Sequence, residues 1–178
     1  ARKIISSMEK MSFVSRETAN AAKIYNNMLK DKDCTIFLTL AGSTSAAGCM
    51  HIYRDMIKYN MIDAIVATGA SIIDMDFFEA LGFKHYQGSQ FQEDTELRKN
   101  YIDRIYDTYI DEDELQMCDK SICEIADKLE PRSYTSREFI NEIGKYLKNN
   151  AKKKGSLIET AYENNVPIFW PAFTDSRA

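Results

Sequence analysis

Two short apolar runs, each followed by a bend of small residues, dominate the pattern of hydrophobic positions along the chain. Residues 35–40 (TIFLTL) and 62–67 (IDAIVA) have the composition of strands that are buried on both faces. The first run leads into the bend 42–48 (GSTSAAG) and then into a helical run that extends from 46 to 59. The second run leads into the bend 68–71 (TGAS). The pattern predicts two parallel strands joined by a helix, with both bends at the carboxyl ends of the strands, where open α/β sheets bind ligands.

Helices outnumber strands in the rest of the chain, and the two types alternate. We expect a further strand over 166–170 and helices over 15–29, 74–81, 95–110, 111–129, 135–147 and 157–164. Thr135 and Ser156 each precede a glutamate by three residues, which is the signature of a capping box. The alternation predicts a doubly wound, mainly parallel α/β sheet with extra helices. We expect one domain over 1–178, with 95–150 as a helical cover.

Charge and composition argue against several functions. The formal net charge is -4, and the short run 152–154 (KKK) has the character of a solvated loop, so nucleic-acid binding is not supported. The four cysteines lack metal-site spacing and there are only two histidines, so no metal site is expected. The start of the chain has no apolar leader segment, and no apolar run is long enough to span a bilayer. We therefore expect a cytoplasmic protein that binds neither membranes nor nucleic acid.

The two bends have the chemistry of a phosphate or dinucleotide cradle. They combine small side chains and hydroxyl donors with the start of a helix, whose unpaired N–H groups attract anions. Neither bend matches the GxGxxG or the GxxxxGK[ST] pattern. The first bend alone is equally well explained as a structural turn, but a second such bend after a neighbouring strand favours a ligand crevice.

Three aspartates are candidate ligand-binding groups. Asp74 and Asp76 could bind the ammonium groups of a polyamine; their alternative role, which we prefer for Asp76, is charge compensation at a helix start. Asp175 follows the strand 166–170 at a ligand-facing position, although an Asx turn explains it as well. His51 is interpreted as a packed or interfacial histidine, and His85 receives no role. The residues predict no nucleophile arrangement.

Four segments together resemble the deoxyhypusine synthase family, and most closely its prokaryotic deoxyhypusine synthase-like branch. They are 34–48 (CTIFLTLAGSTSAAG), 63–89 (DAIVATGASIIDMDFFEALGFKHYQGS), 130–139 (EPRSYTSREF) and 166–176 (VPIFWPAFTDS). The resemblance covers almost the whole chain in order. It implies a Rossmann-like fold that binds NAD and transfers the aminobutyl group of spermidine to an acceptor amine, which in deoxyhypusine synthase is a lysine of translation factor 5A.

The resemblance also implies roles for individual residues. The family's first NAD loop falls on Ser43, Thr44, Ser45, Ala46 and Ala47, and its second on Thr68, Gly69 and Ala70. Asp175 matches an aspartate that contacts NAD. Asp74 falls at the nicotinamide and polyamine end, with Asp76 as the fallback because the local spacing is shifted.

The resemblance places the catalytic lysine, and the histidine and tryptophan of the polyamine pocket, in a carboxyl-terminal half that this sequence lacks. We therefore expect no catalytic residue in the chain, which would be the N-terminal part of a longer NAD-binding domain and inactive by itself. The family forms homotetramers with active sites at a dimer interface, and we expect the same here.

Two alternatives stay open. One is a homospermidine synthase-like enzyme that transfers the aminobutyl group to a free polyamine. Another is a catalytically inactive NAD-binding paralogue or regulatory subunit. A generic Rossmann dehydrogenase is disfavoured, because the GxGxxG turn and the acidic ribose-binding residue after the second strand are both missing.

Overall fold

The computed structural model describes residues 2–171, which fall into two units, one up to Ile36 and one from Phe37 onwards. The first unit holds α1 (Arg2–Met8) and α2 (Val14–Met28), which contact each other. Ala19 of α2 is fully buried. The predicted single domain over 1–178 stays a prediction, and the candidate residues that the structure describes all belong to the second unit.

A three-stranded parallel sheet positions the two bends. Its strands, in the spatial order β1-β2-β6, are β1 (Phe37–Leu40), β2 (Ala64–Ala67) and β6 (Ile168–Phe169). Helix α3 (Met50–Lys58) connects β1 to β2, as the pattern of apolar runs predicts. The predicted mixed α/β fold with a parallel sheet is therefore confirmed, whereas the doubly wound, Rossmann-like arrangement stays a prediction.

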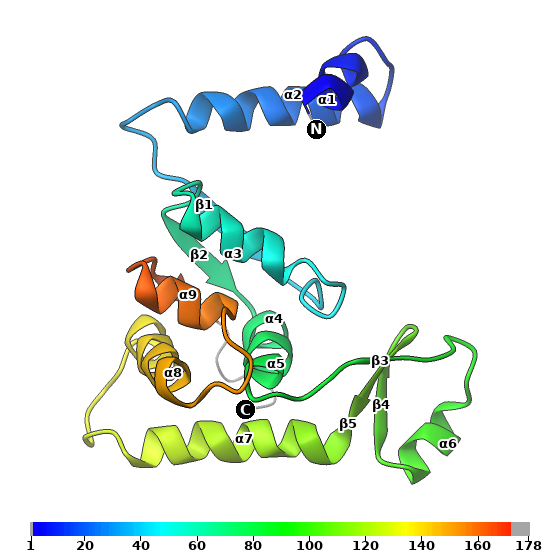
Figure 1. Cartoon of the computed structure of the whole chain (residues 1–178), viewed down its shortest axis with the longest axis vertical. Coiled ribbons are helices and arrows are strands. Elements are labelled where there is room, and N and C mark those ends of the chain that lie inside the picture. The colour runs from blue at the N-terminus through cyan, green and yellow to red at the C-terminus, as the bar shows by residue number, and fades with distance from the viewer. Residues whose placement is uncertain (1, 172–178) are drawn as a thin grey trace. The chain divides into compact units, whose positions relative to one another are not determined.

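A buried helical segment follows β2 and forms the centre of the second unit. It runs without a break through α4 (Gly69–Ser71), the π-helix η1 (Ile72–Phe77) and α5 (Phe78–Ala80). It contacts both α7 and α9 and lies between them in Figure 1. Ile72, Phe77 and Phe78 are all 0% exposed, so this segment is a main part of the core. The predicted helix at 74–81 therefore starts earlier, directly at the second bend.

A small antiparallel sheet replaces most of the helix predicted over 95–110. Helix α6 (Asp94–Lys99) ends early, and β4 (Ile102–Ile105) and β5 (Thr108–Asp111) form a hairpin. The short strand β3 (Tyr86–Gln87) pairs with β5 and completes the sheet in the order β3-β5-β4. The helix prediction was wrong because it relied on apolar residues spaced by four. Residues 102–111 are instead rich in β-branched and aromatic side chains, which favour strands. The predicted helical cover over 95–150 therefore includes a hairpin.

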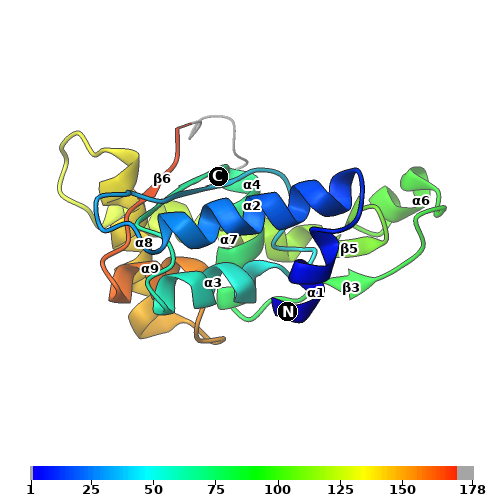
Figure 2. The same cartoon turned by 90° about the horizontal axis from the view of Figure 1, so that it is seen from above.

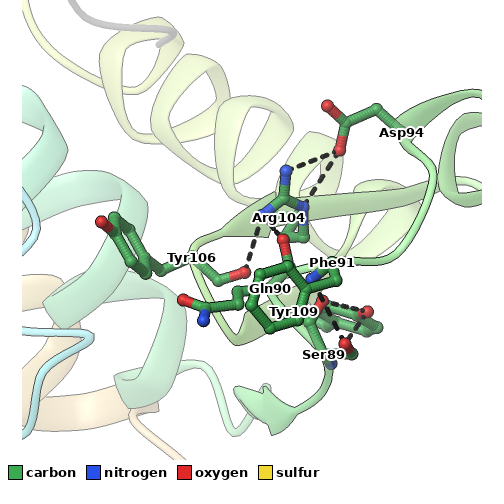
Figure 3. Close-up of polar contacts among 7 residues, drawn as sticks. All are labelled: Ser89, Gln90, Phe91, Asp94, Arg104, Tyr106 and Tyr109. Atoms are coloured by element: carbon green, nitrogen blue, oxygen red, sulfur yellow. Dashed lines mark hydrogen bonds and ion pairs between the residues drawn. The ribbon is translucent and has the colours of Figure 1, made fainter.

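Side-chain hydrogen bonds fasten the loop after β3 to this hairpin (Figure 3). Arg104 donates from Nε and Nη2 to Oδ1 of Asp94, at 3.0 and 2.9 Å, and from Nη1 to the carbonyl oxygen of Gln90 at 3.0 Å. The Tyr109 hydroxyl donates to the carbonyl oxygen of Ser89 at 2.9 Å and accepts from its N–H at 3.0 Å. Figures 1 and 2 both place this sheet at the end of α7 (Glu112–Asp127) that is remote from α8 and α9.

The capping signatures in the sequence correctly mark the starts of α8 (Ser136–Asn150) and α9 (Leu157–Glu163). Thr135 and Glu138 form the predicted capping box. Ser156 accepts from the N–H of Glu159 at 3.1 Å, whereas the Glu159 carboxylate accepts from the N–H of Gly155 at 2.7 Å. Among residues 2–171, no helix has the length and apolar character needed to cross a membrane.

The lysines before α9 lie in an exposed loop, as the sequence predicts, and two of them also form specific contacts. Lys154 Nζ donates to the carbonyl oxygens of Leu147 and Lys148, at 3.1 and 2.7 Å, and to Glu159 Oε1 at 3.1 Å. It therefore caps the carboxyl end of α8, where backbone carbonyls lack partners in the helix. Lys153 forms an ion pair with Glu79.

Helices α8 and α9 pack closely at Gly144. A Cβ atom added there would lie 2.5 Å from the Tyr162 Cβ atom and 3.2 Å from the carbonyl oxygen of Ile158. Glycine is disfavoured inside helices, so its presence here is explained by the short distance between the two helices. This packing positions α9, whose first turn contacts the buried segment after β2.

Replacing Gly144 with alanine should destabilise the protein by about 1–3 kcal/mol, because the clash outweighs the gain of about 1 kcal/mol in helix propensity. Urea unfolding followed by circular dichroism measures the change. Lys145→Ala, at an exposed position in the same helix, should cost less than about 0.5 kcal/mol. An unchanged or raised stability for Gly144→Ala would contradict the close packing.

Candidate functional site

The two bends lie side by side at the carboxyl ends of β1 and β2. The N–H of Thr68 donates to the carbonyl oxygen of Leu40 at 3.2 Å, which extends the strand pairing to the start of the second bend. The Ser45 hydroxyl donates to the carbonyl oxygen of Ser71 at 3.0 Å, and the Ser71 hydroxyl donates to that of Gly42 at 2.6 Å. The structure therefore brings the two predicted loops together.

The first bend is an irregular turn rather than the first turn of a helix. Helix α3 begins at Met50, not at residue 46, because Gly48 has a φ of 84° that an α-helix excludes. Gly42 also has a positive φ, of 69°. A Cβ atom at either glycine would meet nothing within 4 Å, so open space adjoins the backbone of this bend at both ends. Three backbone hydrogen bonds hold its shape, from Ala47 to Ser43, from Gly48 to Ser45 and from Cys49 to Thr44.

Two threonine hydroxyls of the bends are buried without a hydrogen-bond partner within the described part of the chain. They are Oγ1 of Thr44 in the first bend and Oγ1 of Thr68 in the second. A buried hydroxyl without a partner costs about 1–3 kcal/mol and therefore calls for an explanation. Because both hydroxyls belong to adjacent bends, a polar ligand that satisfies them is one explanation.

The remaining loop candidates have small side chains that leave the backbone accessible. Ser43 and Ala46 are half-buried and Ala47 is exposed. Gly69 and Ala70 form the first turn of α4, directly after β2. Asp175 lies outside the described residues, so its predicted contact with NAD stays a prediction.

Asp76 is a structural carboxylate in this fold. It is 4% exposed, and its Oδ1 and Oδ2 atoms accept from the N–H groups of Leu157 and Ile158, at 2.7 and 3.0 Å. Burial raises the pKa of Asp76 to about 6, and the two backbone hydrogen bonds oppose that rise. Asp76 therefore caps α9, a helix far along the chain, rather than the start of its own helix.

Asp74 is the stronger of the two polyamine candidates. It lies on η1 and is half-buried, a few residues after the second bend. Asp76 is the weaker candidate, because its oxygens accept from the backbone N–H groups of Leu157 and Ile158 in α9. Both substrate-binding assignments stay predictions.

A charged cluster that no local sequence pattern predicts lies next to Asp76. Glu79 accepts from His85 Nδ1, at 3.1 Å, and pairs with Lys153. The hydrogen bond from His85, together with Lys153, lowers the pKa of Glu79 to about 2 in spite of partial burial. His85 Nε2 also lies 3.0 Å from Met75 Sδ. This cluster fixes α5 to the loop before α9.

A small cavity separates the first bend from this cluster. Its volume is about 50 Å³, and Ser45, His51, Asp76 and Lys153 are among its lining residues. It could hold water but not a nucleotide. His51 is exposed, which contradicts its interpretation as a packed histidine and leaves the interfacial one as a prediction. Within residues 2–171, no group of three or more potential metal-binding side chains occurs.

Two larger cavities lie away from both bends. One of about 550 Å³ is bordered by α8, α9 and the start of β6, and one of about 830 Å³ by α6, β4 and α7. Among the residues that the structure describes, none of the predicted site residues lines either cavity. The chemistry of the bends, rather than cavity size, therefore identifies the candidate site.

A family model and similar curated proteins match this chain to the same family. A family model described as deoxyhypusine synthase matches residues 3–178. A deoxyhypusine synthase-like protein of Caulobacter vibrioides is 70% identical over 100% of this chain and 49% of its own length. One from Coxiella burnetii is 65% identical, over 100% of this chain and 51% of its own length. A protein named probable deoxyhypusine synthase 2 of Methanosarcina acetivorans is 39% identical, over 97% and 50%.

The chain therefore spans about half the length of the curated relatives that it matches. A solved structure from Entamoeba histolytica, provisionally assigned as a deoxyhypusine synthase, aligns with a TM-score of 0.63 and 22% identity. That alignment covers 98% of this chain and 61% of the other. At this identity the comparison shows that the two proteins share a fold.

The buried Asp76 should make stability depend on pH. Its pKa is about 6 in the folded protein against an ordinary value of 3.8, so the folded state binds a proton that the unfolded state releases. The contribution of Asp76 should therefore be largest below pH 3.8 and should fall by about 3 kcal/mol as pH rises through 6, at about 1.4 kcal/mol per pKa unit.

Urea unfolding of the wild type and of Asp76→Asn, from pH 4 to pH 7, tests this dependence. The stability of the wild type relative to Asp76→Asn should decrease as pH rises, because the variant lacks the titrating group. Asp113→Asn, at an exposed position on α7, should show no such trend. A constant difference between wild type and Asp76→Asn would show that Asp76 does not titrate in this range.

Proposed function

Because this chain belongs to the deoxyhypusine synthase family, we propose that the protein carrying it is a deoxyhypusine synthase-like aminobutyltransferase. In an NAD-dependent reaction it takes the aminobutyl group of spermidine and passes it to an acceptor amine, a lysine of translation factor 5A. The observation that carries the proposal is the family match over residues 3–178. The proposal concerns the full-length protein, because the relatives are about twice as long as this chain.

In this proposal, the two bends hold NAD. Ser43, Thr44, Ser45, Ala46 and Ala47 form one side of the NAD site, and Thr68, Gly69 and Ala70 form the other, with Asp175 as a further contact. The residues present fit such a ligand, because Thr44 and Thr68 have buried hydroxyls without partners that a nucleotide's polar groups could satisfy. When bound, NAD supplies the hydride acceptor for oxidation of the amine.

Asp74 supplies negative charge at the polyamine end of the proposed site. It follows the second bend on η1, and its carboxylate is half-buried, so its field is only partly screened by water. Oxidation of an amine to an imine builds positive charge, which a nearby carboxylate stabilises. Asp74 also attracts the ammonium groups of spermidine, whereas Asp76 is a weaker candidate because it caps α9.

The resemblance supplies the rest of the proposal. The catalytic lysine comes from the part of the full-length protein that follows this chain. The protein acts in the cytoplasm as a homotetramer with active sites at a dimer interface.

Thr44→Val should change apo stability and NAD binding in opposite directions. It removes a buried hydroxyl without a partner, so the apo protein should gain about 1 kcal/mol of stability. It also removes a proposed ligand contact, so the Kd for NAD should rise about fivefold to tenfold. Calorimetric titration and urea unfolding of the full-length protein measure the two effects. Thr95→Val, on the exposed side of α6, should change neither. Equal NAD affinity of Thr44→Val and wild type would exclude Thr44 as a contact.

Mass spectrometry of the reaction products tests the proposed activity. The full-length protein, incubated with NAD, spermidine and translation factor 5A, should add an aminobutyl group to one lysine of the factor. Asp74→Asn should lower the rate about tenfold or more, because the variant loses the stabilising charge. Glu124→Gln, at an exposed site on α7, should retain the wild-type rate.

Two results of that assay would contradict the proposal. Formation of homospermidine from spermidine and putrescine, with no modified factor, would identify a free polyamine as the acceptor. Binding of NAD without any product would identify a catalytically inactive paralogue.

A further inference from the structure

Two buried serine hydroxyls connect the bends in opposite directions. Ser45 is 3% exposed and Ser71 is 0% exposed. Ser45 donates from the first bend to the carbonyl oxygen of Ser71, at 3.0 Å, and Ser71 donates back to the carbonyl oxygen of Gly42, at 2.6 Å. We call this reciprocal pair the serine clasp. It joins segments that are 26 and 29 residues apart in the sequence.

The clasp uses the only hydroxyl proton of each serine. A serine side chain has one O–H donor, and here both donors are directed at backbone carbonyls of the opposite bend. Neither serine can then donate to a ligand without breaking the clasp. Thr44 and Thr68, whose hydroxyls are buried without a partner, are one from each bend. Of these four hydroxyls, those of Ser45 and Ser71 thus bond within the described part of the fold, whereas those of Thr44 and Thr68 do not.

We propose that Ser45 and Ser71 are positioning residues that hold the two bends in a fixed relation, so that Thr44 and Thr68 can contact one nucleotide together. The inference rests on the proposed NAD site, and it deepens that proposal in two ways. It assigns a role to Ser71, which neither the sequence pattern nor the family resemblance singles out. It also changes the role of Ser45 from a ligand contact to a support.

The clasp also connects the first bend to the proposed polyamine end. Ser71 is the last residue of α4, and η1 begins at the next residue and carries Asp74. A ligand that spans both bends requires their relative position to be held within a fraction of an ångström. Hydrogen bonds in a buried, low-dielectric environment are strong enough to contribute to that order. Loss of the clasp should therefore loosen both loops while leaving α8 and α9 intact.

Calorimetric titration with NAD and hydrogen exchange of the full-length protein test the inference together. Ser71→Ala and Ser45→Ala should each raise the Kd for NAD at least tenfold, at a temperature where circular dichroism shows both variants folded. The double variant should cost less than the product of the two, because each single change removes one of the two hydrogen bonds and loosens the contact that holds the other. Ser45→Thr keeps the donor and should remain within threefold of wild type.

Hydrogen exchange locates the effect. Amides of residues 44–49 should exchange at least tenfold faster in Ser71→Ala without NAD, and amides of α8 should not change. The matched control is Ser121→Ala on α7, which removes a serine hydroxyl that also donates to a backbone carbonyl, that of Met117 at 2.8 Å. It should leave both the Kd and the exchange rates within twofold of wild type.

The results separate this inference from the proposed function. If the wild type binds NAD and both alanine variants bind it equally well, the clasp does not position the ligand loops and the proposed function stands. If the wild type does not bind NAD, the proposed function fails. Hydrogen exchange without NAD then still tests whether the clasp orders the bends. Faster exchange confined to the bends in Ser71→Ala supports that role of the clasp, and unchanged exchange overturns it.

Discussion

The parallel pairing of β1 with β2 is the constraint on which the candidate site depends. Phe37 pairs with Ala64 and Leu40 with Ala67, so both strands end at the same level of the sheet. Parallel strands present their carboxyl ends at one edge, and whatever follows them must begin there. The chain places small residues after both strands, which allows the two bends to approach each other closely enough for side chains to bond across them. A longer or bulkier residue in either bend would interfere with that approach.

A buried carboxylate, that of Asp76, anchors the helical segment that follows the second bend. The carboxylate of Asp76 is taken out of water, which raises its pKa to about 6, and it is retained because two backbone N–H groups of α9 bind it. Since α9 packs on α8 through Gly144, the segment that carries Asp74 is connected to the helical part of the unit. Packing and hydrogen bonds thus fix η1 at both ends, at Ser71 and at Asp76.

The sequence was sufficient to predict the features that depend on local pattern. The apolar runs located β1 and β2, and the glutamates after Thr135 and Ser156 marked two helix starts. Prediction failed where long-range contacts decide the structure. The hairpin at 102–111 has apolar residues at helical spacing, but strand pairing and the bonds of Arg104 and Tyr109 to the preceding loop favour the extended form.

In the candidate site, too, some features could be predicted from local sequence and others depend on long-range contacts. Adjacency of the bends could be predicted, because it follows from strand order. The partner of Asp76 could not, because the cap joins residues 81 and 82 positions apart. The same holds for the ion pair of Lys153 with Glu79, whose residues are 74 positions apart. Local sequence contains no signal for either contact.

For the proposed NAD site, the serine clasp offers a physical reason why the bends lack the GxGxxG pattern of dinucleotide sites in other proteins. In the GxGxxG turn, glycines let the backbone approach the pyrophosphate and the neighbouring helix closely. Here the bend 42–48 keeps glycine only at its two ends, where φ is positive, and places serine at the inner position 45. A serine that bonds to the opposite bend fixes the loop by a directional contact, whereas glycine would leave it more flexible. In the proposed site, hydroxyl groups thus provide the order that close glycine packing provides in GxGxxG turns, and a search for glycine patterns alone would not find such a site.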